Sequence, residues 1–156
     1  MDELSMCCDG VARGNPGVVG AGVVARDHGA NVVGSMSVGL GITTNYLVEI
    51  LGILFGLEWA RQWGYLKICI RSDSMSVVKA LSSSTIPWFV RQHWSEVSYS
   101  YEAIRFEHTY KEANFAADNM AKRGCILPNE EIRHYIGRPY FLTSVEFPNI
   151  SYFRFK

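Results

Sequence analysis

The sequence predicts one mixed α/β domain, and three observations carry this prediction. Residues 4–39 contain three short strand patterns separated by turn signals, which favours an antiparallel arrangement. Residues 44–64 then repeat apolar side chains at helical spacing. After residue 64, strand patterns alternate with helical ones, as is typical of a sheet with helices on its faces.

The bulk composition fits a folded domain of the size that 156 residues allow. The chain is 48% hydrophobic and 19% charged, so it can build a core. Lys+Arg and Asp+Glu both number 15, and this neutral balance argues against strong non-specific binding of nucleic acid, although a local groove stays possible. Only eight residues precede Asp9, which is consistent with a domain taken from a longer chain.

The cysteines and the apolar runs set the expected compartment. The spacing of the cysteines matches neither a CxxC pair nor a zinc site, so we expect small buried thiols in a reducing environment. The four cysteines are Cys7, Cys8, Cys69 and Cys125. No apolar run approaches the roughly 20 residues that span a bilayer, so we expect no membrane partner. The expected location is intracellular, in the nucleus or the cytoplasm.

The first third of the chain is expected to fold as an antiparallel meander. Residues 4–9 (LSMCCD) predict a first strand that ends at Asp9, and GNPG at 14–17 predicts a turn. Residues 18–26 predict a second strand, and residues 32–39 predict a third. The intervening DHGAN segment is expected to form a hairpin loop.

A long helix is expected from Thr44 to about Gly64, capped by Thr43 or Thr44. At about 100° per residue, Glu49 shares a face with small residues that would let the helix approach a sheet closely. These neighbours are Gly52, Ile53, Gly56 and Ala60. Glu58, nine residues further along, lies about 180° away and is expected at the solvated surface. Glu49 is therefore the site candidate of this helix.

The remaining elements alternate between strand and helix. Residues 65–71 and 103–110 predict the fourth and fifth strands, and helices are expected at 74–83 and from Pro87 to about Tyr101. A last helix is predicted over 112–124, closed by Gly124. We expect the domain to cover residues 1–127. Residues 128–156 are aromatic-rich and irregular, and are expected to pack on the domain or to bind a partner.

Four acids stand out by their positions: Asp9, Glu49, Asp73 and Asp118. A cluster of carboxylates repels itself unless a cation neutralises it, and hard oxygen ligands favour Mg²⁺ or Mn²⁺. Two such ions can activate a water and stabilise the leaving oxygen of a phosphodiester. Alternatively, each acid acts singly: Asp9 forms a turn, Asp73 caps a helix, and the other two lie on helix surfaces.

Four motifs together resemble those of ribonuclease H type 1 domains. They are DGVARGNPGVVGAGVV, TTNYLVEILGILFGLEWA, IRSDSMSVVKAL and FEHTYKEANFAADNMAKRG, in family order over about residues 5–124. The resemblance is strongest to the reverse-transcriptase-like domains of plant genomes, many of them tied to non-LTR retroelements. It implies an RNase H-like five-stranded mixed sheet in the order 3-2-1-4-5, with strands 1–3 antiparallel and helices on both faces.

The resemblance also implies an activity and its residues. The family cleaves the RNA strand of RNA–DNA hybrids with two Mg²⁺ or Mn²⁺ ions held by an Asp-Glu-Asp-Asp set. By motif match this set is Asp9, Glu49, Asp73 and Asp118. His108 matches a histidine that assists proton transfer or product release, unless it is simply a satisfied histidine at a strand end. The implied contacts to the hybrid are Gly10, Asn15, Thr44, Asn45 and Asn114.

Departures from the family pattern keep other functions open. Tyr46 stands where many relatives carry a second asparagine, and Ala12 replaces a position that is often larger or polar. Residues 82–94 lack the lysine-rich protrusion of some bacterial relatives. Trp88, Phe89 and Trp94 are expected mainly in the core, with a partner surface as the alternative.

These departures leave three functional hypotheses. The first is a hybrid-cleaving endonuclease, which a parent polyprotein can hold near its substrate. The second is a domesticated domain, catalytically weak or inactive, that binds nucleic acid or a protein partner. The third is a related nuclease that acts on DNA or single-stranded RNA.

Overall fold

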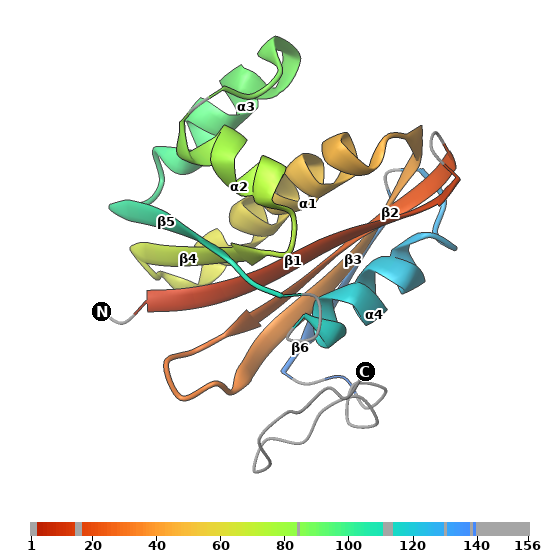
Figure 1. Ribbon diagram of the computed structural model, residues 1–156. Coiled ribbons are helices and arrows are strands. Elements are labelled where there is room, and N and C mark those ends of the chain that lie inside the picture. The colour runs from red at the N-terminus through yellow and green to blue at the C-terminus, as the bar shows by residue number, and fades with distance from the viewer. Residues whose placement is uncertain are drawn as a thin grey trace.

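The computed structural model describes residues 3–14, 17–83, 85–110, 114–129, 131–137 and 139. These residues form a six-stranded mixed sheet with helices on both faces. Helices α1, α2 and α3 lie on one side of the sheet, and α4 lies on the other (Figure 1). The predicted fold class is therefore confirmed.

The strand order is β5-β4-β1-β2-β3-β6. Strand β1 (Glu3–Gly14) pairs antiparallel with β2 (Gly17–Arg26), and β2 pairs antiparallel with β3 (Val32–Thr43). Strand β4 (Lys67–Ser72) runs parallel to β1, and β5 (Ala103–His108) runs parallel to β4. The order 3-2-1-4-5 that the family resemblance implied holds for these five strands.

A sixth strand corrects the expectation for the C-terminal region. Strand β6 (Ile132–Ile136) pairs antiparallel with β3, so the sheet extends past residue 127 instead of ending with five strands. The sequence of β6 (IRHYI) places polar and apolar residues on both faces, so no period-2 signal marks it. Residues 140–156 lie outside the described part, and the domain boundary at residue 127 stays a prediction.

The helices begin and end close to where the sequence predicted. Helix α1 (Asn45–Ala60) is capped by Thr44, whose Oγ1 accepts a hydrogen bond of 3.4 Å from the Leu47 amide. A short 3₁₀ turn, η1 (Arg61–Trp63), follows, and Gly64 ends it with a left-handed φ of 74°. The others are α2 (Met75–Ser82), α3 (Trp88–Ser98) and α4 (Phe115–Gly124).

The main core lies between the sheet and α1. Its fully buried side chains include Leu4, Met6, Ile50, Ile53, Leu54, Leu57, Ile68 and Ile70. Helix α1 approaches β2 closely because Gly52 has no side chain: a Cβ there would lie 2.6 Å from the Cβ of Ala21. The predicted small-residue face of α1 therefore does contact the sheet.

Helix α4 packs even more closely on the opposite face. A Cβ on Gly22 of β2 would lie 2.3 Å from the Ala121 backbone nitrogen, so the helix backbone rests directly on the strand. Ser37 of β3 adds a hydrogen bond of 2.7 Å from its hydroxyl to the carbonyl oxygen of Met120. The sheet is thus sandwiched between two helices that each contact its central strands.

The aromatic residues of α3 only partly follow the expectation. Trp94 is partly buried and packs near Phe106, with ring centroids 5.9 Å apart. Trp88 and Phe89 are 79% and 57% exposed, so the expectation of a core position is wrong for both. They lie in the first turn of α3, which projects away from the sheet (Figure 1).

The four cysteines are buried thiols, as predicted. Among the described residues, no helix has the length and apolarity needed to cross a bilayer.

Candidate active site

Three acids converge at the point where β4 ends beside β1. Asp9, Glu49 and Asp73 each offer a carboxylate oxygen, and these three atoms lie within 4.8 Å of one another. Asp9 and Glu49 are buried, and Asp73 is half-buried. We call these three residues the acidic group.

The register of β1 and β4 brings Asp9 and Asp73 together. The last pair of this parallel ladder is Cys8 with Ser72, so the residue after each member of the pair lies just beyond the ladder. Strand β1 itself continues to Gly14, so the expectation that Asp9 ends the strand is wrong. The strand that ends beside Asp9 is β4, the parallel neighbour of β1, and the end of β4 leaves space for polar side chains.

Asp73 connects β4 to α2 without capping the helix. The cap is Ser74, whose Oγ accepts a hydrogen bond of 3.4 Å from the Val77 amide. Ser72 supports the turn by accepting a hydrogen bond of 3.1 Å from the Ser74 amide. The alternative of Asp73 as helix N-cap is therefore wrong, and its carboxylate belongs to the acidic group.

Glu49 reaches the acidic group because Gly10 lets α1 approach β1. A Cβ on Gly10 would lie 2.6 Å from Val48 Cγ1 and 2.8 Å from Glu49 Cγ. The structure therefore gives Gly10 a role in helix packing, and the expected close approach of its backbone to the substrate stays a prediction. Glu58 lies elsewhere, as predicted, and forms an ion pair with His93.

Asp118 is the fourth acid of the expected set, and it has an ion-pair partner on its own helix. Among the described residues, the group within 4.8 Å does not include it. Its Oδ2 pairs at 3.0 Å with Nζ of Lys122, one turn further along α4. The sequence analysis missed this lysine, although the Asp-x-x-x-Lys spacing on a predicted helix was a readable signal.

Asn114 has a positioning role in the structure, and its expected contact with the hybrid stays a prediction. It is 1% exposed, and its Nδ2 donates a hydrogen bond of 3.0 Å to the carbonyl oxygen of Cys8. Since Cys8 precedes Asp9, this bond ties the start of α4 to the strand that carries the first acid. The side chain therefore holds two elements of the site in place.

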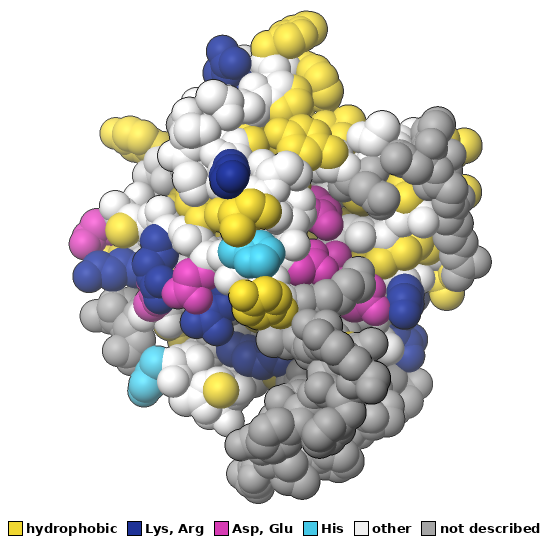
Figure 2. Space-filling view, viewed as in Figure 1, with side chains coloured by type: hydrophobic (Ala, Val, Ile, Leu, Met, Phe, Trp, Pro, Cys, Tyr) yellow, Lys and Arg dark blue, Asp and Glu magenta, His cyan; other side chains and the backbone are white. Residues whose placement is uncertain are grey.

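His108 lies beside Asp73 at the end of β5. It pairs in register with Ser72, and its Nε2 donates to the Asp73 carbonyl oxygen at 3.3 Å. The imidazole is exposed, and its ring meets that of Tyr110 edge-on at 5.6 Å. In Figure 2, acidic side chains and a histidine gather near the centre of the visible face. The geometry is that of a strand-end histidine, and a proton-transfer role for it stays a prediction.

The other expected substrate contacts are less informative. Thr44 is exposed and caps α1. Asn15 lies outside the described residues, as does the side chain of Asn45.

The charges at this site fit a divalent cation. Three carboxylates this close repel one another, and two of them are buried, so a positive ion would stabilise their charged forms. Burial raises the pKa of the Cys8 thiol well above its usual range, and the negative charges of Glu49 and Asp9 add to this effect. Cys8 therefore stays neutral, and the donors that remain are hard oxygens suited to Mg²⁺ or Mn²⁺.

The strand order, the two helical layers and the acids beyond the β1–β4 ladder define an RNase H-like domain. The chain belongs to the reverse transcriptase-like family, whose model matches residues 7–124.

The chain resembles named proteins as well as the family. It is 30% identical over 118 residues to an Arabidopsis thaliana protein that carries a provisional ribonuclease H name, covering 72% of this chain and 19% of that protein. RNase H1 from the archaeon Halobacterium salinarum superposes with a TM-score of 0.72 at 25% identity, over 78% of this chain and 96% of that one. LC11-RNase H1, solved in complex with RNA/DNA hybrid, shares the fold with a TM-score of 0.70 at 24% identity, over 78% and 96%.

The chain spans only 19% to 48% of the length of the curated relatives it matches.

Proposed function

We propose that this domain hydrolyses the RNA strand of RNA–DNA hybrids with the help of two Mg²⁺ or Mn²⁺ ions. The observation that carries this proposal is the acidic group, whose three carboxylate oxygens lie within 4.8 Å of one another. Membership of the reverse transcriptase-like family supports the reaction class. The hybrid bound by the structural neighbour LC11-RNase H1 supports the substrate.

The residues of the acidic group would hold the ions, and Asp118 is proposed as the fourth ligand. When bound, divalent ions would lower the pKa of a water and neutralise charge on the phosphodiester. Asp9 and Glu49 are fixed by the packing of β1 and α1, so they would provide a pre-organised cradle. Asp118 would exchange Lys122 for the cation, because a divalent charge competes with an ammonium for the same carboxylate.

His108 is proposed to carry protons at the rim of the site. Its imidazole is exposed next to Asp73, and imidazoles exchange protons near neutral pH. Its bond to a main-chain oxygen orients the ring without consuming a carboxylate. We propose that His108 accepts or returns a proton while the three acids keep their negative charge.

A second candidate function is binding without cleavage. The observation that favours it is the Asp118–Lys122 ion pair, in which a lysine occupies one carboxylate oxygen of an expected metal ligand. The formal net charge of zero also predicts weak intrinsic attraction to nucleic acid. A parent polyprotein or an intracellular protein partner would compensate for this by raising the effective concentration.

Cleavage of an end-labelled hybrid separates these functions. The wild-type chain is assayed with Mg²⁺ and with Mn²⁺ on RNA–DNA hybrid, double-stranded DNA and double-stranded RNA. Cutting of the RNA strand of the hybrid alone, abolished in Asp73→Asn, would support the nuclease. The substitution Glu96→Gln, at an exposed position of helix α3, controls for the loss of one carboxylate. Hybrid binding without cutting in either metal would support the second candidate, and cutting of DNA would overturn the proposed substrate.

A further inference from the structure

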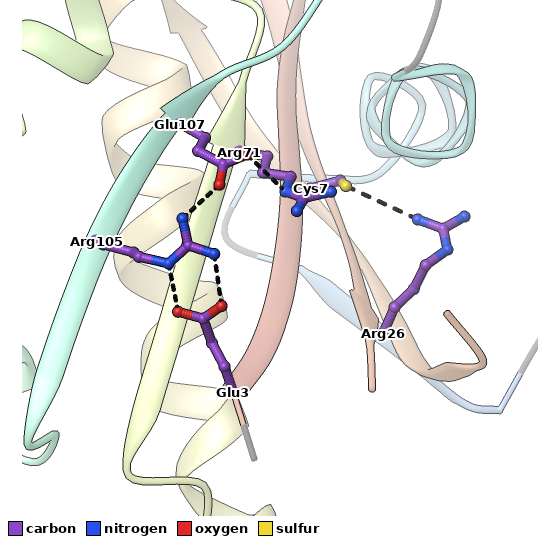
Figure 3. Close-up of polar contacts among 6 residues, drawn as sticks. All are labelled: Glu3, Cys7, Arg26, Arg71, Arg105 and Glu107. Carbon is purple, nitrogen blue, oxygen red and sulfur yellow. Dashed lines mark hydrogen bonds and ion pairs between the residues drawn. The ribbon is translucent and has the colours of Figure 1, made fainter. Parts of the chain in front are cut away.

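A pocket of about 380 Å³ lies on the same face of the sheet as α4, beside the first half of β1. Its walls come from β1, β4 and the hairpin between β2 and β3. Its polar donors are Ser5, Cys7, Arg26, His28 and Arg71. We call it the arginine pocket, and Figure 3 shows four of its lining residues: Glu3, Cys7, Arg26 and Arg71.

The sheet register places two guanidinium groups on either side of β1. Arg26 of β2 pairs with Ser5, and Arg71 of β4 pairs with Cys7. Residues directly opposite one another in a ladder point to the same face, as do residues two apart in one strand. Both arginines therefore project from the face that carries Ser5 and Cys7, in agreement with Figure 3.

The acids around this pocket already have cationic or backbone partners. Arg105 binds Glu3 through two hydrogen bonds of 2.6 and 2.7 Å, and it also pairs with Glu107. Glu107 lies 3.4 Å from Nε of Arg71. Asp27 accepts hydrogen bonds of 2.9 and 3.0 Å from hairpin amides, which hold its pKa below the usual range. The carboxylates of Glu3 and Glu107 thus hold Arg71 and Arg105 in place, and that of Asp27 stabilises the hairpin.

Arg26 faces a thiol in this pocket. Its Nη1 donates to Cys7 Sγ at 3.8 Å, and a thiol sulfur is a weak acceptor compared with a phosphate oxygen. A guanidinium presents five donors in a planar fork that matches phosphate oxygens. The guanidinium fork therefore suits a phosphate oxygen better than it suits the sulfur.

The arginine pocket and the acidic group lie next to each other along β1 and β4. Cys7 precedes Asp9 by two residues on β1, and Arg71 of β4 precedes by two residues Asp73, which directly follows that strand. Two residues of strand span about 7 Å, so Cys7 and Arg71 lie a short distance from the acids that follow them. A strand held at the acidic group thus passes within reach of the two arginines.

We propose that the arginine pocket binds a phosphate group, supplied by the nucleic-acid strand that the acidic group engages. The choice of source rests on the proposed function, because the strand must be present at the acidic group. Phosphate binding itself is argued from the residues of the pocket alone, and a free phosphate ester would use the same donors. The volume is sufficient for a phosphate with its attached sugar.

The test compares Arg26→Gln with Arg133→Gln. The second substitution removes the same charge from β6, the edge strand on the far side of β3. Arg133 is 60% exposed and pairs with Glu131, so it controls for a general change in net charge. One arm measures fluorescence anisotropy of a labelled RNA–DNA hybrid in EDTA at several salt concentrations. A second arm measures the shift in melting temperature with inorganic phosphate and with uridine 5′-monophosphate. Both arms measure binding and not cleavage, and EDTA removes the divalent ions that cleavage needs. The pocket can therefore be tested even if the nuclease assay fails.

Arg26→Gln is expected to weaken hybrid binding by about fivefold and to lower the salt slope by about one, with Arg133→Gln within about twofold of wild type. Arg26→Lys is expected to recover part of the loss, since it keeps the charge and loses the fork. If Arg26→Gln lost only the stabilisation by free phosphate compounds, the pocket would still be a phosphate site, but its ligand would be a free phosphate ester and not the nucleic-acid strand. Equal effects of Arg26→Gln and Arg133→Gln in both arms, with each variant folded by circular dichroism, would overturn the proposal.

Discussion

Helices α1 and α4 hold the sheet from opposite faces, and each carries one of the expected acids. Both press their backbones onto β2, α1 through Gly52 and α4 against Gly22. Yet Glu49 of α1 joins the acidic group, whereas Asp118 of α4 is paired with Lys122. Close packing therefore fixes where a helix lies but not whether its carboxylate reaches a shared centre.

The difference between the two acids follows from their local surroundings. Glu49 is buried where Gly10 leaves room for it against β1, so its side chain has one direction to take. The side chain of Asp118 is 16% exposed, and a lysine lies one turn away on the same helix. The site thus has a rigid half built by α1 and the strands, and an adjustable half on α4.

The largest effect is expected from Glu49→Gln compared with Glu58→Gln on the same helix. Glu49→Gln removes one charge from the acidic group and should reduce hybrid cleavage by about 10³-fold or more, since metal-assisted charge stabilisation contributes several kcal/mol. Glu58→Gln removes an identical charge on the other side of α1 and should leave cleavage within about twofold. Initial rates with Mg²⁺ measure both, and a Glu49→Gln variant as active as Glu58→Gln would remove the acidic group from the mechanism.

The next effect concerns stability, and it compares Gly22→Ala with Gly56→Ala. A Cβ on Gly22 would meet the backbone of α4 at 2.3 Å, and backbone cannot move aside, so we expect a loss of about 3 kcal/mol. A Cβ on Gly56 would meet the flexible end of Met6 at 2.7 Å, and alanine also favours the helix, so we expect a change of about 1 kcal/mol or less. Urea unfolding measures both. Similar losses in the two variants would mean that α4 rests on the sheet less tightly than described.

Most of the fold was readable from the sequence because its signals are local. Thr44 and Gly64 mark the ends of the first helical segment, and the spacing of Glu49 and Gly52 predicted the face that meets the sheet. Strand β6 was not readable, because its partner is β3, almost a hundred positions away, and its own alternation is weak. Tertiary pairing, and not propensity, makes residues 132–136 a strand.

The site was only partly readable for a related reason. Sequence position and resemblance named Asp9, Glu49 and Asp73, and the structure brings these together. The burial of Asn114 and the pairing of Asp118 depend on side-chain directions at the start of α4, which spacing does not determine. A motif match names residue types at a site but does not fix their rotamers.

A smaller effect on cleavage is expected from Asp118→Asn. This residue lies outside the acidic group, so its loss should reduce the rate by about 10- to 100-fold, less than that of Glu49→Gln. Lys122→Gln should leave the rate near that of wild type or raise it slightly, because it frees the carboxylate to turn toward a cation. Side-by-side rates at several Mn²⁺ concentrations check this order. If Asp118→Asn matches Glu49→Gln, α4 is as much a part of the metal site as α1, and the division into rigid and adjustable halves fails.

The smallest effect is expected from Asn114→Ala, with Asn119→Ala as the control on the same helix. Asn114→Ala leaves the buried Cys8 carbonyl without its 3.0 Å hydrogen bond, which should cost about 1–2 kcal/mol in the free energy of unfolding. Asn119 is half-buried and accepts a longer hydrogen bond of 3.4 Å from Arg123, so its loss should cost about 0.5 kcal/mol or less.

Urea unfolding measures the stability of both variants, and Mn²⁺ titration of the same samples measures their affinity for the metal. Because the lost bond joins α4 to the residue before Asp9, Mn²⁺ affinity should fall in Asn114→Ala and stay constant in Asn119→Ala. If a stable Asn114→Ala variant bound Mn²⁺ normally but the hybrid more weakly, the result would instead support the predicted contact between Asn114 and the substrate.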